Sequence, residues 1–207
     1  MATFIQGRSV RRLPELTDEV LRGSPRRITE YGEAILHRPC RTVREFGADR
    51  WAALIDDMFA TMWIAEGCGL AANQVDVDAR LFVYDLTDEN GDRHLGHVFN
   101  PRIESLAGIV GDQSGGEGCL SVPGATEQVA RPGRVVLRGV DLEARPLQVE
   151  ASGYLARCLV HETQHLDGTV YVDGLPPSAR ERALLQSASA RNTVFARREA
   201  RQRELGK

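Results

Sequence analysis

The stretch GYLARCLVHETQHLDG, residues 153–168, decides the fold and most of the chemistry that the sequence predicts. Its residues Leu155, Leu159 and Leu166 recur at helical spacing, and the Asp-Gly pair at its end is typical of a helix stop. The pattern therefore predicts a buried helix over about residues 153–167.

Within this helix, the sequence HETQH places His161 and His165 four residues apart. Residues at that spacing lie on the same face of a helix, so both imidazoles can bind one metal ion. Glu162 between them can reach a metal-bound water and act as a general base. The alternative is a solvated helix with two surface histidines, which the apolar face of this helix argues against.

A catalytic site of this kind needs a third protein ligand. The longer metzincin motif would require a histidine where the chain has Tyr171. Glu181 or Glu199 could serve as in thermolysin-like enzymes, but both lie among arginines on the tail. Cys119 is the better candidate, because a cysteine and two histidines form a sound tetrahedral set. Alone, Cys119 would be interpreted as a small buried apolar residue.

Two glycine-rich segments accompany these residues. The first precedes Cys119, and we expect it to be a loop that is flexible or lets the backbone approach a ligand. The second is GCGLAANQ, residues 67–74, whose Gln74 amide could donate to a developing oxyanion. By itself the second segment is typical of a helix end followed by a turn. The glycines of the first segment are Gly108, Gly111, Gly115, Gly116 and Gly118.

The rest of the chain predicts an α+β fold. Residues 49–65 carry apolar side chains at helical spacing, which predicts a helix packed on the core. Short β-rich runs follow between 81 and 150, and 178–205 lacks Gly and Pro and predicts a C-terminal helix. This order favours α+β over a doubly wound α/β fold. Residues 1–27 are expected to be a loosely ordered lead with one helical turn.

Composition limits the classes of protein that fit. The chain has 207 residues, 42% of them apolar, which suits one globular domain. No apolar run is long enough to span a bilayer. The four cysteines fit reduced thiols in a cytosolic protein.

The formal net charge of −3 is unevenly distributed. Residues 28–177 hold 12 Arg against 23 acids, whereas 178–207 hold seven Arg and one Lys against three acids. Such an acidic body argues against direct sequence-specific nucleic-acid binding. The basic tail could contact an anionic partner or be a solvated surface.

Three motifs in this order, GCGLAANQ, EGCLS and HETQH, resemble the signature motifs of the peptide deformylase family. The likeness covers about residues 28–175. It implies an α+β fold with antiparallel β-sheets around a central HExxH helix and a C-terminal helix. It also implies a catalytic domain over 28–177, preceded by an N-terminal extension, 1–27, and followed by a basic helical tail, 178–207.

The resemblance implies one divalent metal held by Cys119, His161 and His165, natively Fe²⁺ and replaceable by Zn²⁺ or Ni²⁺. The implied reaction removes the N-formyl group from the initiator formylmethionine of new proteins and releases formate. We expect it to take place in the cytoplasm.

For this reaction Glu162 is the expected general base. The Gln74 side chain and the Leu120 backbone N–H are the expected oxyanion donors. An extended formylated peptide is expected to pair with the backbone on both sides of the site, and an apolar pocket takes its methionine. The expected substrate-binding residues are Gly67, Cys68, Gly69, Gly115, Gly116, Glu117, Tyr154 and Cys158.

The tail could dock on the ribosome, where members of such a family meet nascent chains. Two other functions remain open at this point. One is a metalloprotease that cuts internal peptide bonds, and the other is a metal-stabilised binding module.

The chain departs from the family pattern at three positions. Val160 stands where glutamine is usual, Gln164 where aspartate is usual, and Cys68 where an aliphatic residue is usual. The first two flank the metal-binding histidines, and such neighbours orient ligands and tune the metal. Rate or metal preference is therefore expected to differ from that of a typical member.

Overall fold

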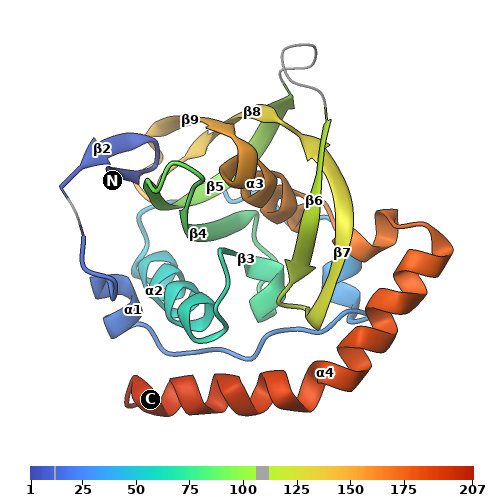
Figure 1. Cartoon of the computed structure of the whole chain (residues 1–207). Helices are drawn as coiled ribbons and strands as arrows, with labels where there is room; N and C mark the ends of the chain where they lie inside the picture. Colours follow the sequence, from blue (N-terminus) through green and yellow to red (C-terminus); the bar gives the residue numbers. More distant parts are fainter. Residues whose placement is uncertain (12, 106–111) are drawn as a thin grey trace.

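The computed structural model describes residues 1–11, 13–105 and 112–207. It has a mixed α+β architecture in which a curled sheet and a small two-stranded sheet surround helix α3, and a long helix runs along the outside (Figure 1). In chain order the elements are β1 Thr3–Ile5, β2 Arg8–Val10, α1 Asp18–Arg22, η1 Ala34–His37, α2 Asp49–Ile64, β3 Gly69–Ala71, η2 Ala72–Val75, β4 Leu81–Thr87, β5 Arg93–Ser105, β6 Asp112–Cys119, β7 Val122–Pro132, β8 Arg134–Val140, β9 Pro146–Ser152, α3 Gly153–Leu166, η3 Tyr171–Gly174 and α4 Pro177–Glu204.

The larger sheet has seven strands organised around the long strand β5. One half of β5 pairs with β4, and the other half pairs with β8 after a register shift between Phe99 and Arg102. Such an irregularity bends a strand, which helps the sheet to curl. β1 lies parallel to β5, so the expectation of antiparallel pairing throughout is wrong at this position. The other pairings are antiparallel.

Helix α3 is buried, as its leucine pattern predicts. It contacts strands of both sheets, namely β3, β4, β5, β7, β8 and β9. Leu155, Leu159 and Leu166 pack with Phe82 and Leu137 of the larger sheet in one apolar cluster. Burying each such side chain contributes about 1.5–3 kcal/mol, so this face anchors the helix.

The prediction of a core helix over 49–65 is also confirmed, since α2 covers Asp49–Ile64. Its apolar stripe, including Leu54, Met58 and Phe59, is buried against the outer face of β4 and its neighbours. The glycines just after α2 lead into β3, which brings the GCGLAANQ segment to the edge of the sheet.

The expectation of a loosely ordered lead over 1–27 is wrong, whereas the helical turn expected there is confirmed as α1. β1 and β2 form a short hairpin, and β1 joins the larger sheet beside β5. Val20 of α1 is buried in the cluster around α2. Three-residue strands are too short to produce a periodic signal, so only their pairing with distant segments reveals them.

The glycine-dense stretch is a strand where the structure describes it. β6 pairs with β7 from Asp112 to Gly118, so the expected loop around 115–117 is wrong. Gly108 and Gly111 lie outside the described residues. Glycine is unfavourable in strands, and here pairing with the long strand β7 along the whole of β6 overcomes that preference.

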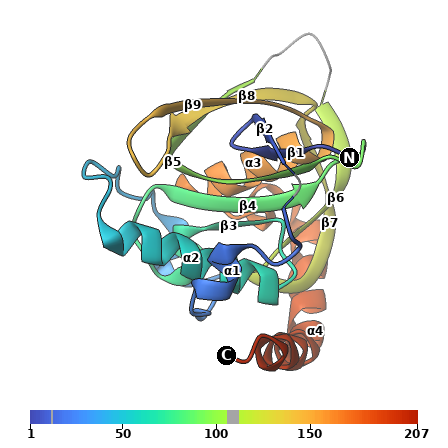
Figure 2. The same cartoon turned by 90° about the vertical axis from the view of Figure 1, so that its left-hand side faces the viewer.

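The C-terminal helix is confirmed as α4, Pro177–Glu204. It passes beneath the ends of β6 and β7 and ends near α1 (Figures 1 and 2). Ala183 is its buried residue, so apolar packing alone does not hold it. In the described part of the chain, no helix combines the length and apolar character that crossing a bilayer requires.

Candidate active site

Three potential metal ligands converge between α3 and the end of β6. The Nε2 atoms of His161 and His165 lie 3.2 Å apart, and Cys119 Sγ lies 3.1 Å from His165 Nε2. All three donor atoms lie within 4.8 Å of one another. Helical spacing brings the histidines together, and a register shift after Gly118 turns Cys119 towards them.

This donor set fits a metal ion. Two neutral imidazoles whose Nε2 lone pairs face each other repel unless a proton or a cation lies between them. A cysteine and two histidines are also a donor set that zinc and similar divalent metals accept, with one position left open. These residues could therefore hold one ion.

His161 is oriented from behind by a buried carboxylate. Its Nδ1 lies 2.7 Å from Glu117 Oε1, and Glu117 also pairs with Arg131 and Arg157. Burial alone would raise the pKa of Glu117, but hydrogen bonds from Arg131 and His161 hold that pKa well below its usual range. A charged Glu117 accepts the Nδ1 proton and leaves Nε2 of His161 free for a metal.

Glu162 lines the cleft, and its carboxylate has an unsatisfied oxygen. Its Oε2 is buried and has no hydrogen bond to the residues that the structure describes. A Cβ at Gly69 would lie 2.7 Å from Glu162 Cδ, so only glycine there leaves room for the carboxylate. Burial raises the pKa of Glu162 to about 8, and a cation at the neighbouring ligands would lower it again.

The candidate oxyanion donors lie beside Cys119. The Gln74 side chain accepts a hydrogen bond from the Ala71 N–H at 2.9 Å, which orients the amide. Its Nε2 then points to Ser121 Oγ at 3.1 Å and to Cys119 Sγ at 3.5 Å. Leu120 follows Cys119 directly, and its carbonyl accepts a hydrogen bond from Arg198 of α4.

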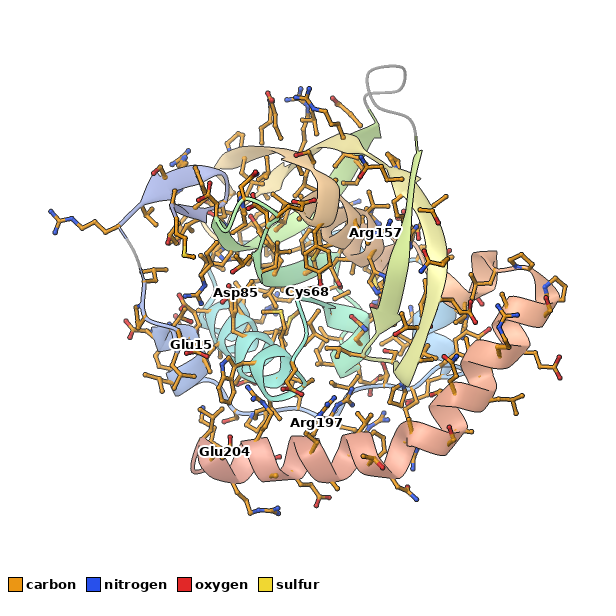
Figure 3. All side chains as sticks on the ribbon, in the orientation of Figure 1. Glu15, Cys68, Asp85, Arg157, Arg197 and Glu204 are labelled. Carbon is orange, nitrogen blue, oxygen red and sulfur yellow. The ribbon has the colours of Figure 1, made fainter. Side chains whose placement is uncertain are left out.

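A cleft of about 350 Å³ opens above these residues. Most of the expected substrate-binding residues line it, and Figure 3 places Cys68 between α3 and α4. Gly115 instead faces Arg157, whose Nη2 would lie 2.9 Å from a Cβ at that position. The expected residues that line the cleft are Gly67, Cys68, Gly69, Gly116, Glu117, Tyr154 and Cys158.

Comparison with known proteins decides between the alternatives that the HExxH motif leaves open. The family model described as Polypeptide deformylase matches residues 25–181. The chain belongs to this family. Polypeptide deformylases remove the N-formyl group from the N-terminal formylmethionine of nascent chains in a metal-dependent hydrolysis.

Individual deformylases resemble the chain over most of its length. Peptide deformylase 2 of Streptomyces avermitilis is 45% identical over 169 residues, which are 82% of this chain and 89% of that protein. A crystal structure of peptide deformylase from Ehrlichia chaffeensis has a TM-score of 0.73 and 32% identity, covering 83% of this chain and 99% of that chain. One from Synechococcus elongatus in complex with actinonin has a TM-score of 0.70 and 34% identity, covering 78% and 85%.

The structure shows what Gln164 and Val160, which depart from the deformylase motifs, contact. Gln164 Oε1 accepts a hydrogen bond from Arg131 Nη1 at 2.7 Å, so it joins the group around Glu117. Val160 is buried in the apolar cluster between α3 and the sheet. Neither side chain is a ligand, and Gln164 reaches His161 only through Arg131 and Glu117.

Sequence reasoning missed the two arginines that hold Glu117. Arg157 lies four residues before His161, so helical spacing places it on the same face, and this signal could have found it. Arg157 also donates to the carbonyls of Gln113 and Val129, at 2.8 and 2.9 Å. Arg131 has no local signal, because only the pairing of β6 with β7 brings it to Glu117.

Proposed function

We propose that Cys119, His161 and His165 hold the divalent metal of this deformylase and that Glu162 moves the proton of the reaction. The observation that carries the proposal is the convergence of three donor atoms within 4.8 Å, next to the buried Glu162 Oε2, which no described residue hydrogen-bonds. When bound, the metal supplies Lewis-acid activation of water and of the formyl oxygen.

The residues of the chain perform the remaining steps. Glu162 takes a proton from the attacking water, whose oxygen bonds to the formyl carbon. The Gln74 Nε2–H and the Leu120 backbone N–H donate to the oxygen that becomes negative. When the C–N bond breaks, Glu162 returns the proton to the amine. The products are formate and a peptide with a free N-terminus.

The test is Glu162→Ala, compared with Glu150→Ala on the exposed side of β9 as a matched control. Glu162→Ala is expected to retain metal while formate release from formyl-Met-Ala-Ser falls about 10²-fold to 10⁴-fold. Glu150→Ala is expected to keep wild-type turnover. Normal turnover by a metal-loaded Glu162→Ala enzyme would remove Glu162 from this role.

The formylated peptide is proposed to enter as an extended strand. β3 lies at the edge of the larger sheet, and β6 pairs on one side only, with β7, among the described residues. β3 and β6 therefore each offer a backbone edge to the cleft. Main-chain pairing along Gly67–Gly69 and Gly116 gives affinity without demanding a particular sequence. Gly115 faces Arg157 and is not needed in this arrangement.

The methionine side chain is proposed to occupy the end of the cleft near Cys68, Tyr154 and Cys158. Cys158 Sγ lies 3.5 Å from the Cys68 carbonyl, so the two segments form one continuous wall. Methionine suits such a pocket because its thioether is flexible and polarizable.

The native metal is proposed to be Fe²⁺, with Zn²⁺ or Ni²⁺ as replacements. The two imidazoles and one thiolate accept all three ions, so the choice of iron depends on the family resemblance. Metal analysis of anaerobically purified protein, with formate release measured on the same sample, tests it. Zinc as the dominant metal in a fully active sample would contradict it.

The enzyme is further proposed to work in the cytoplasm and to contact ribosomes through α4. The surface of α4 is basic, but several of its cations already pair with the body, such as Arg182 with Glu127 at 3.0 Å and Arg191 with Glu30 at 2.7 Å. Ribosome co-sedimentation of wild type is compared with that of a variant reversing Arg182, Arg191 and Arg203 to Glu. Equal co-sedimentation of the two folded proteins would reject ribosome docking through α4.

A further inference from the structure

Helix α4 forms one wall of the active-site cleft, a role that the charge of the tail does not predict. Val194, Arg197 and Arg198 line the cleft together with Cys119 and Glu162. Figure 3 shows Arg197 on the side of α4 that faces the body, below Cys68. A peptide that leaves the metal centre on this side must pass the arginines of α4.

The charge of Arg197 is already balanced by an ion pair with Glu66. Arg197 Nε lies 2.9 Å from Glu66 Oε2, and Arg201 approaches the same carboxylate at 3.5 Å. Arg201 also stacks over the Trp63 ring at 4.0 Å. These contacts attach α4 to the end of α2 and leave little free charge at Arg197.

Arg198 has no such acidic partner. Its Nη2 donates to the neutral carbonyl of Leu120 at 3.0 Å, and its Nε is buried without a hydrogen bond to the described residues. No carboxylate of the described residues lies within 4.0 Å of it. A guanidinium stays charged in proteins. Glu30, which pairs with Arg191, acts on Arg198 only over a longer distance. Arg198 therefore presents to the cleft a cation that no carboxylate of the described residues contacts directly.

We propose that Arg198 forms a subsite for a carboxylate of the substrate peptide, downstream of the formylmethionine. The direction of the chain follows from the proposed function, because the formyl group is the N-terminal end and the remaining residues run outwards. The planar guanidinium suits a carboxylate, and a charge-assisted hydrogen bond in this half-buried place is strong. The carboxylate is an acidic side chain or the C-terminus of a short peptide.

The test compares peptides that differ only in charge. Formyl-Met-Ala-Asp-Ala-amide and formyl-Met-Ala-Ala-Asp-amide are each paired with the Asn peptide, and formyl-Met-Ala-Ser is paired with its amide. Wild type is expected to have a KM at least about fivefold lower for the acidic member of one pair, with kcat little changed. The pair that responds identifies the source of the carboxylate. High salt is expected to reduce the preference.

Arg198→Gln is expected to abolish the preference, and Arg198→Lys to restore part of it. Arg203→Gln is the matched control, because this exposed residue carries the same charge on the same helix. The ratio of the two KM values within a peptide pair reports recognition of charge, because a general effect of Arg198 on Leu120 would change both values equally. Equal KM values in wild type for every pair, or a preference that persists in Arg198→Gln, would overturn the subsite.

Failure of the proposed function has a different signature. If metal-loaded wild type releases no formate from any peptide, the proposed chemistry fails. In that case calorimetric titration of the same peptide pairs still tests the Arg198 subsite. A Kd about fivefold lower for the acidic peptide of a pair supports the subsite, and equal Kd values in every pair overturn it.

Discussion

Helices α3 and α4 differ in how they are attached to the same body. α3 is buried on nearly all sides, and its Arg157 and His161 pair inside the protein with Glu117 of β6. α4 lies on the surface, has Ala183 as its buried residue, and is attached mainly through ion pairs. The comparison teaches that similar charged contacts serve different purposes in buried and exposed places. In α3 they orient His161 inside the protein, whereas on α4 they hold an exposed helix against the body.

The largest effect is expected where a buried ion pair is broken. Glu117→Gln leaves Arg131 and Arg157 without a counter-charge in a buried place, so we expect a loss of about 3–5 kcal/mol in the free energy of unfolding. The variant should also retain less metal, because His161 loses its orienting partner. Urea denaturation and metal analysis measure the two effects.

The matched change beneath α4 is Glu127→Gln on β7, which removes the partner of Arg182. Because Arg182 is exposed, the expected loss is below about 1 kcal/mol, with normal metal content. Equal losses for Glu117→Gln and Glu127→Gln would show that burial does not distinguish the two helices.

Loss of an apolar side chain is also expected to destabilise the protein far more on α3 than on α4. Leu159 on α3 is 0% exposed and Leu185 on α4 is 65% exposed. Leu159→Ala is expected to cost about 2–5 kcal/mol, since it removes a core side chain and leaves a cavity. Leu185→Ala is expected to change stability by less than about 0.5 kcal/mol. Thermal and urea unfolding of both variants check this contrast, and a large loss for Leu185→Ala would reveal a hidden apolar contact of α4.

The smallest expected effect is a response of α4 to acid. The hydrogen bond from Arg191 lowers the pKa of Glu30 below its ordinary value of about 4.3. The pair therefore contributes stability above that ordinary pKa, and this contribution is lost as the pH falls through the lower, folded-state pKa. After correction for the intrinsic pH dependence of exchange, the protection of the α4 backbone amides is expected to fall in this acidic window before that of α3.

Glu30→Gln is the control for this acid response, because its amide does not titrate over that range. In this variant the protection of the α4 amides should no longer fall over the same window. An acid response that is unchanged in Glu30→Gln would assign it to another carboxylate of α4 or of the surface beneath it.

Local patterns in the sequence determined much of this protein. Apolar residues at helical spacing revealed α2 and α3, and two histidines four residues apart placed two donors on one face. These features depend on neighbours within one or two turns, and helical geometry alone relates such neighbours.

Only the tertiary structure decided what lies around those features. It made Asp112–Cys119 a strand, placed β1 beside β5, brought Arg131 to Glu117 and laid Arg198 of α4 against Leu120. Each of these contacts joins residues distant in sequence, so it depends on strand register and on the packing of separate elements. Short-range patterns in the sequence carry no information about such long-range contacts. The candidate metal ligands could therefore be proposed from the sequence, whereas the wall that α4 forms on the cleft could not.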